Sequence, residues 1–125
     1  MSGYRQKLGK TGENLAAQFL QRKGYQILER NYRKYRGEID LIARDGNCLV
    51  FVEVKTARSR EFGHPVLKVD RRKREQLGKI AMAYYQEHEL EDQESRFDVV
   101  TVVFRGGKAE IEHFENAFWL EAPPL

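Results

Sequence analysis

Two carboxylates and a lysine lie on neighbouring apolar segments, and their spacing predicts that they share one patch. Glu53 and Lys55 end the apolar run 48–55, and residues two apart on a strand point to the same face. The run is too apolar for a half-exposed strand, so it predicts a buried central strand. Asp40 lies in the run 38–43 that precedes it. Unpaired charges are costly in such surroundings, so these residues indicate a site.

The segment between the two runs predicts a tight hairpin. Asp45-Gly46 is a strong signal for a two-residue turn. With that turn, Glu38 falls opposite Glu53 and Asp40 falls opposite Phe51. Asp40 then becomes the diagonal neighbour of Glu53 on the same face. The hairpin is therefore expected to gather three carboxylates and one lysine.

A hard divalent cation would balance these charges. Two like charges ~4 Å apart repel by roughly 4 kcal/mol at an effective dielectric constant of ~20, so a cation or a proton has to compensate them. Mg²⁺ binds one or two protein carboxylates together with water and phosphate oxygens. Asp40 and Glu53 supply that number of ligands, with the Val54 carbonyl nearby, and Lys55 could orient or deprotonate a water. The alternative is an ion pair between Glu53 and Lys55 on an exposed strand end.

The pattern of Asp40, twelve residues, and then Glu53-Val54-Lys55, with Glu13 on the preceding helix, resembles the PD-(D/E)XK nuclease superfamily. Within it the chain is similar to the YraN-type group of bacterial proteins and to archaeal Holliday-junction resolvases. Ile39 stands where the superfamily name places a proline. The resemblance covers nearly the whole chain, through the segments 11–16, 37–42, 52–55 and 96–100.

The resemblance implies roles for these residues and a substrate. Asp40 and Glu53 would be metal ligands, Lys55 the catalytic lysine, and Glu13 an assisting glutamate that acts through a second metal or a water. The implied activity is a Mg²⁺- or Mn²⁺-dependent endonuclease acting on branched or structured DNA, such as Holliday junctions, in repair or recombination. RNA as substrate and a homodimer both stay open. The alternative function is a non-catalytic nucleic-acid-binding module that retains the nuclease fold.

Length and composition predict one domain over residues 1–125, with 41% hydrophobic and 33% charged residues. No apolar run approaches the ~18 residues of a membrane span, and the start lacks the apolar stretch of a signal peptide. The single cysteine, Cys48, excludes an internal disulfide and suits a reducing compartment. We therefore expect a cytoplasmic protein with no membrane contact. The three histidines lie far apart and show no zinc-type spacing.

The charge is unevenly distributed along the chain. Residues 1–79 hold 19 basic against 9 acidic side chains, whereas residues 80–125 hold 3 against 10. A basic half favours a phosphate-backbone partner, although a basic protein without such a partner has the same composition. The candidate nucleic-acid contacts are Arg33, Arg36, Arg58, Arg60 and the helix start Arg71, Arg72, Lys73 and Arg74, where the helix dipole disfavours cations. Tyr32, Tyr35 and Phe62 could stack on exposed bases or pack within loops.

Periodicity and turn residues predict an α/β domain with a mixed sheet flanked by helices, which the resemblance identifies as restriction-endonuclease-like. The expected order is an αβββαβ core plus a C-terminal edge strand. The first helix is expected over 12–23 with Thr11 as N-cap, and the second from 71 with Asp70 as N-cap. The expected strands are 25–32, 38–43, 48–55 and 97–104, with an edge strand at 109–114 and a long loop at 57–70.

Overall fold

Five strands pair in chain order, β1-β2-β3-β4-β5, and every neighbouring pair is antiparallel except β3 with β4. The computed structural model describes residues 2–58 and 69–118, with side chains from residue 7 onward. A helix lies between β3 and β4, as a parallel pair requires a crossover. The elements are α1 (Ser2–Arg22), β1 (Gln26–Lys34), β2 (Gly37–Asp45), β3 (Cys48–Arg58), α2 (Arg71–Glu87), β4 (Ser95–Arg105) and β5 (Lys108–Phe114). The expected mixed α/β sheet is confirmed.

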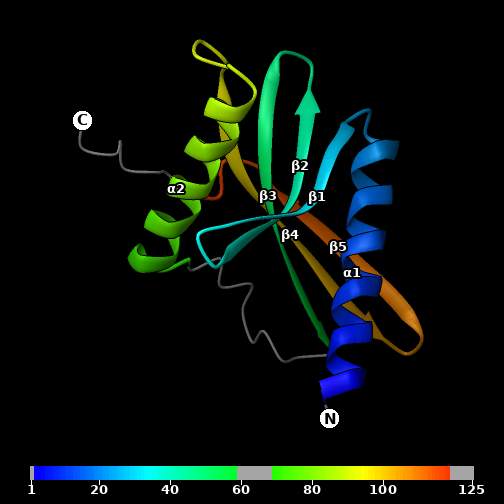
Figure 1. Cartoon of the computed structure of the whole chain (residues 1–125). Coiled ribbons are helices and arrows are strands. Elements are labelled where there is room, and N and C mark those ends of the chain that lie inside the picture. The colour runs from blue at the N-terminus through cyan, green and yellow to red at the C-terminus, as the bar shows by residue number, and fades with distance from the viewer. Residues whose placement is uncertain (1, 59–68, 119–125) are drawn as a thin grey trace.

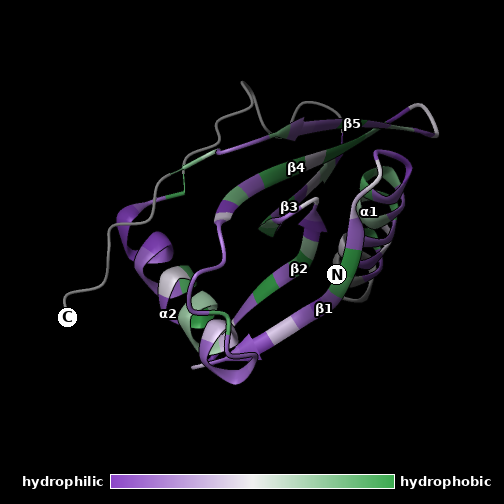
Figure 2. Ribbon diagram, turned by 90° about the horizontal axis from the view of Figure 1, so that it is seen from above, coloured by the Kyte–Doolittle hydropathy of each residue, from purple (hydrophilic) through white to green (hydrophobic). Residues whose placement is uncertain are grey.

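The two helices cover opposite faces of the sheet (Figure 1). The central strand β3 alternates between them, because Phe51 packs with the α2 cluster while Val50 and Val52 pack with the α1 cluster. Figure 2 shows the apolar sides of both helices turned toward the strands, whereas β5 at the edge is mostly hydrophilic. Glu53, two residues after Phe51, therefore continues on the α2 face.

The helix α1 starts ten residues earlier than the sequence predicted, at Ser2. Thr11 is consequently a helix-interior residue and not an N-cap. The predicted end is confirmed, because Gly24 has φ +96° and the Tyr25 N–H donates to the Leu20 carbonyl at 3.0 Å, as in a Schellman motif. Glu13 therefore lies in the middle of a long helix, where the helix dipole has little effect on its carboxylate.

The turn between β2 and β3 also differs from the prediction. The two-residue loop is Gly46-Asn47, with Asp45 paired to Cys48, because Gly46 takes φ +58° at the first central position, as in a type II′ turn. Relative to the predicted pairing, the register is shifted by two residues, so that Leu41 pairs with Val52. The next positions along the two strands, Asp40 and Glu53, then lie opposite each other. A shift of two leaves every side chain on its expected face.

The second half of the chain follows the prediction closely. The Asp70 carboxylate accepts the Lys73 N–H at 2.8 Å as N-cap of α2. One face of α2 is buried along its length, the predicted edge strand pairs with β4 as β5, and Phe118 packs on Phe97 with ring centroids 5.1 Å apart. Residues 59–68 of the predicted loop, with Arg60 and Phe62, lie outside the described residues, as do Trp119 and Leu120. Neither α1 nor α2 carries an apolar stretch long enough to cross a membrane.

A close approach of α1 to β3 fixes the position of the first helix. A Cβ atom added at Gly12 would lie 2.2 Å from the Thr56 hydroxyl oxygen, whereas one added at Gly9 would meet nothing within 4 Å. Only a residue without a side chain fits at position 12 without a shift of the helix or of the Thr56 side chain. Glu13, the next residue along α1, is therefore held close to the sheet.

This contact gives a matched pair of substitutions in one helix. Replacing a helix-interior glycine with alanine normally stabilises by ~0.5–1 kcal/mol, so Gly9→Ala should raise the free energy of unfolding. Gly12→Ala should lower it by ~1 kcal/mol or more, because the added methyl group overlaps Thr56. Urea unfolding measures both free energies. Adding Thr56→Ala to the Gly12→Ala variant should recover part of the lost stability. Equal stabilisation by the two glycine substitutions would show that α1 does not approach β3 this closely.

Candidate functional site

The strands β2 and β3 separate at Asp40. Their backbone pairing ends at Leu41 with Val52. Immediately beyond, the Val54 N–H donates to the Asp40 carboxylate at 2.7 Å. The Asp40 side chain thus replaces the backbone carbonyl that would accept this hydrogen bond in a regular sheet. We call this point, with Asp40 on one strand and Glu53 and Val54 on the other, the fork. The hydrogen bond holds the Asp40 carboxylate in one orientation there.

A backbone irregularity accompanies the fork. Ile39 packs with the α2 cluster and Leu41 with the α1 cluster, although residues two apart on a regular strand share a face. On β1, between the residues that pair with Ile39 and Leu41, Asn31 takes φ +52°. This conformation is uncommon for residues other than glycine, with asparagine among the exceptions. The local twist turns Asp40 away from regular strand geometry.

Three carboxylates gather at the fork. One oxygen each from Glu13, Glu38 and Asp40 lie within 4.8 Å of one another, and all three residues are half-buried. The Asn31 amide bridges two of them, because its nitrogen donates to Glu13 and to Glu38, each at 2.7 Å. These residues come from α1, β1 and β2, so the site depends on three separate elements.

The charges at the fork are incompletely balanced. Burial and the neighbouring Glu53 carboxylate raise the pKa of Asp40 to about 8, although the Val54 N–H opposes the shift. Burial also raises the pKa of Glu53, although the Lys73 and Lys55 ammonium groups lower it. A proton or a cation must therefore join the cluster near neutral pH.

The structure thus brings the predicted residues together at one place. Asp40 lies close to Glu13, the Glu53 carboxylate raises the pKa of Asp40, and the Lys55 ammonium lowers the pKa of Glu53. Val54, expected to offer its carbonyl, contributes its N–H to Asp40.

One member of the site was missed at the sequence level. Glu38, expected in the carboxylate patch, joins the cluster directly, but Asn31, which holds Glu13 and Glu38, was not identified. The only available signal for Asn31 was an asparagine within a predicted strand, where this residue type is depleted.

The basic residues of the β1–β2 turn lie next to the first turn of α2. Together they line a hollow of about 670 Å³. The Lys73 ammonium lies 3.9 Å from the Glu53 carboxylate, so this cation also borders the fork. The hollow is lined by Arg33, Lys34, Tyr35, Arg36, Gly37, Glu38, Lys73 and Gln76.

The other candidate contacts have different surroundings. Arg71 pairs with Glu75 at 3.1 Å, and Arg72 and Arg58 are exposed. Arg74 has a buried Nε atom with no hydrogen-bond partner among the described residues. Tyr32 cannot stack on a base, because it is buried with its ring centroid 5.2 Å from that of Tyr84. Tyr32 belongs to the core because it pairs with the buried Ile39.

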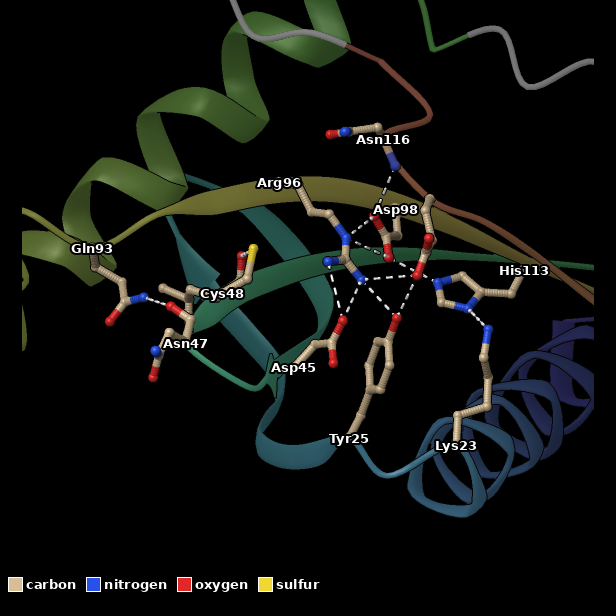
Figure 3. A network of polar contacts seen from close by, with 12 residues as sticks. Lys23, Tyr25, Asp45, Asn47, Cys48, Gln93, Arg96, Asp98, His113 and Asn116 are labelled. Atoms are coloured by element: carbon tan, nitrogen blue, oxygen red, sulfur yellow. Dashed lines mark hydrogen bonds and ion pairs between the residues drawn. The ribbon is translucent and has the colours of Figure 1, made fainter.

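A second group of acidic residues, around Asp98, has the opposite character (Figure 3). Asp98 is fully buried and accepts the Arg96 Nε–H at 3.0 Å and the Asn116 N–H at 3.0 Å. The Lys23 ammonium donates to Nδ1 of His113, so His113 presents its Nε2–H to Asp98, at 2.7 Å. Burial alone raises the pKa of Asp98, but these hydrogen bonds outweigh it and leave the pKa lowered. Asp98 also forms an ion pair with Arg96, so this group is satisfied within the chain.

Known proteins resemble this chain over most of its length. The sequence model of the family described as "Uncharacterised protein family UPF0102" matches residues 12–102. A UPF0102 protein of Geobacter metallireducens is 46% identical over 120 residues, covering 96% of this chain and 98% of the relative. One of Trichlorobacter lovleyi is 45% identical, covering 90% and 91%, and one of Syntrophus aciditrophicus is 46% identical, covering 91% and 90%. The matched range includes Glu13, Asp40, Glu53 and Lys55.

The raised pKa of Asp40 predicts a pH-dependent stability. A carboxyl group with a raised pKa keeps a proton that the unfolded chain releases near pH 4. Without metal, the free energy of unfolding should therefore fall between about pH 4 and about pH 8, by on the order of 1 kcal/mol or more. Asp40→Asn should reduce that slope, leaving the smaller contribution of Glu53, and should be more stable than the wild type at pH 8.

Divalent cations should act in the same pH window. Mg²⁺ or Mn²⁺ should raise the melting temperature of the wild type at pH 8 and have little effect at pH 5, where Asp40 is protonated. Thermal melts at both values measure this. Asp92→Asn, in the exposed acidic loop, is the control and should behave like the wild type. Identical melting of wild type and Asp40→Asn under all conditions would show that Asp40 and Glu53 do not share a site.

Proposed function

The chain belongs to the UPF0102 family, and we propose that it is a metal-dependent endonuclease that hydrolyses phosphodiester bonds in DNA. One observation carries the proposal, namely the gathering of the Glu13, Glu38 and Asp40 carboxylates where two strands of a buried sheet separate, with the Glu53 charge acting on Asp40 and the Lys55 charge acting on Glu53. Holding like charges together costs stability that a purely structural protein has no reason to give up. Sites with strongly perturbed pKa values are candidates for catalysis.

The donor set fits a hard divalent cation. The fork offers carboxylate oxygens and no thiolate or imidazole among the described residues, and oxygen ligands suit Mg²⁺ and Mn²⁺. Asp40 and Glu53 would hold the cation, with Glu13 as a further ligand or as the ligand of a second cation. When bound, the cation supplies stabilisation of the negative charge that develops on the scissile phosphate.

The remaining residues of the fork position these groups and handle a proton. Lys55 lies on the same face as Glu53 and is suited to orient or deprotonate the attacking water. Asn31 holds Glu13 and Glu38 by hydrogen bonds, and the Arg33 guanidinium pairs with Glu38 at 3.3 Å. The Val54 N–H fixes Asp40. Glu13, Glu38 and Asp40 are therefore oriented before substrate arrives, which is the arrangement that efficient catalysis requires.

The basic surface beside the fork supports a nucleic-acid substrate. The first turn of α2 contains no acidic residue and four cations, which oppose the helix dipole unless an external anion binds there. No described element resembles a base-reading helix-turn-helix or zinc finger, which favours recognition of shape through the phosphate backbone. Branched DNA is proposed from the resemblance to Holliday-junction resolvases. The two-fold geometry of such a junction would suit a homodimer.

The alternative is a nucleic-acid-binding module without catalysis. The basic hollow would serve such a module equally well, whereas the carboxylate cluster would not, because it repels phosphate. A panel of linear, flap and four-way-junction DNA with Mg²⁺ or Mn²⁺, together with RNA of the same sequence, separates the two functions. Divalent-dependent cleavage of any member supports an enzyme, and tight binding without cleavage supports the module.

Substitutions at the fork should separate chemistry from binding. Asp40→Asn, Glu53→Gln and Lys55→Met should each abolish divalent-dependent cleavage and leave DNA affinity within a few-fold of wild type. The three residues act as a unit, so double substitutions should be scarcely worse than single ones. Asp92→Asn is the matched control and should cleave normally. Near-wild-type cleavage by any one of the three variants removes that residue from the mechanism.

Substitutions in the first turn of α2 test the DNA surface. Arg71→Gln with Arg72→Gln relieves the conflict with the dipole and breaks one exposed i,i+4 pair worth ~0.3–0.5 kcal/mol, so stability should change little. DNA affinity should fall, and the slope of log affinity against log salt should flatten by about 0.9 for each lost phosphate contact. Lys79→Gln, two turns further along α2, is the control. An unchanged affinity and slope would show that this turn is solvated and does not contact DNA. The candidate DNA contacts would then be Arg33, Arg36 and Arg58.

A further inference from the structure

The turn between β1 and β2 has an unusual combination of conformation and sequence. Lys34 pairs with Gly37, so the loop consists of Tyr35 and Arg36 alone. Both take positive φ values, +52° and +59°, as in a type I′ turn. Asn-Gly is the favoured sequence for this turn, because large side chains are disfavoured at positive φ. A sequence selected only for folding would not place tyrosine and arginine here.

Packing does not explain the choice of tyrosine. The Tyr35 side chain is 65% exposed, and Met82 is the only other large hydrophobic side chain that is exposed among the described residues. Tyr32, three residues earlier, is buried in the core. The aromatic ring of Tyr35 therefore stays in solvent at the tip of a hairpin.

The hairpin tip is held firmly in place beside α2. Figure 1 shows the β1–β2 turn next to the start of α2. A Cβ atom added at Gly37 would lie 2.7 Å from the Gln76 amide nitrogen and 2.8 Å from Ile80, so this turn and α2 are in close contact. Lys34 also pairs with Glu87 at the far end of α2. Tyr35 consequently projects from a supported position.

The surroundings of Tyr35 are positively charged and lead to the fork. Arg33, Lys34, Arg36 and Lys73 line the same hollow as Tyr35, against a single carboxylate, Glu38. Glu38 belongs also to the carboxylate cluster, and Lys73 lies 3.9 Å from Glu53. A polyanion bound along the hollow would therefore pass directly to the fork.

We infer that Tyr35 is a stacking platform for an unstacked base of a DNA strand whose phosphates lie on Arg33, Arg36 and Lys73. An aromatic ring among cations is the arrangement that binds single-stranded segments, because every base has a face that can stack and every nucleotide has a phosphate. A fully paired duplex offers no free base face. Tyr35 would thus direct the fork to interruptions in a duplex. The inference rests on the proposed function only in taking DNA as the ligand.

The test compares two substitutions at this position. Tyr35→Asn removes the ring and places a residue that tolerates positive φ, so the protein should be at least as stable as wild type in a thermal melt. Tyr35→Phe keeps the ring and is the matched control. The probes are a duplex with a single unpaired 2-aminopurine and the same duplex fully paired, both in EDTA so that no cleavage occurs.

Wild type and Tyr35→Phe should quench the fluorescence of the unpaired 2-aminopurine and bind that duplex more tightly than the paired one. Tyr35→Asn should lose the quenching, bind the interrupted duplex roughly 5- to 150-fold more weakly, and bind the paired duplex unchanged. Equal quenching and affinity for Tyr35→Asn and wild type would overturn the inference, whether or not the protein cleaves DNA. A Tyr35-dependent preference without any divalent-dependent cleavage would uphold it and reject the nuclease.

Discussion

Electrostatic repulsion between carboxylates held partly out of water is the constraint on which the rest of the site depends. Burial, together with repulsion from Glu53, Glu13 and Glu38, raises the pKa of Asp40 to about 8. The chain limits this cost with an N–H from Val54, the Asn31 amide and nearby lysines. These partners orient the carboxylates but do not neutralise them. The fork therefore retains negative charge that a proton or a bound cation could balance.

The group around Asp98 shows that buried acidic residues are not in themselves a functional site. Asp98 is more deeply buried than Asp40, yet its pKa is lowered, because Arg96, His113 and the Asn116 N–H all donate to it. The two groups lie toward opposite ends of the β2–β3 ladder, since Arg96 also bonds Asp45 beside the turn. The same residue types thus stabilise the fold at one end and leave an unbalanced charge at the other. The number of internal donors makes the difference.

The departures from regular backbone geometry cluster around the fork and the hollow. Asn31, whose amide bridges two carboxylates, has a left-handed backbone conformation. Tyr35 and Arg36, which form the β1–β2 turn, have the same backbone conformation. Gly12 and Gly37 each permit a close approach between a helix and a strand. Unfavourable backbone conformations of this kind persist where the surrounding fold enforces them, and they are common at functional sites. A rigid sheet between two helices provides that support here.

Much of the architecture follows from the sequence alone. The alternation along β3, the stripe on α2, its Asp70 cap and the Gly24 stop are local signals, because each depends on residues within a few positions of one another. The spacing of Asp40, Glu53 and Lys55 likewise follows from one hairpin. Only the tertiary structure placed Glu13 and Asn31 against them, because these contacts join α1, β1 and β2 and depend on close packing at Gly12. The exact register was also seen only in the structure, since the β2–β3 turn could close at either of two neighbouring pairs that leave every side chain on the same face.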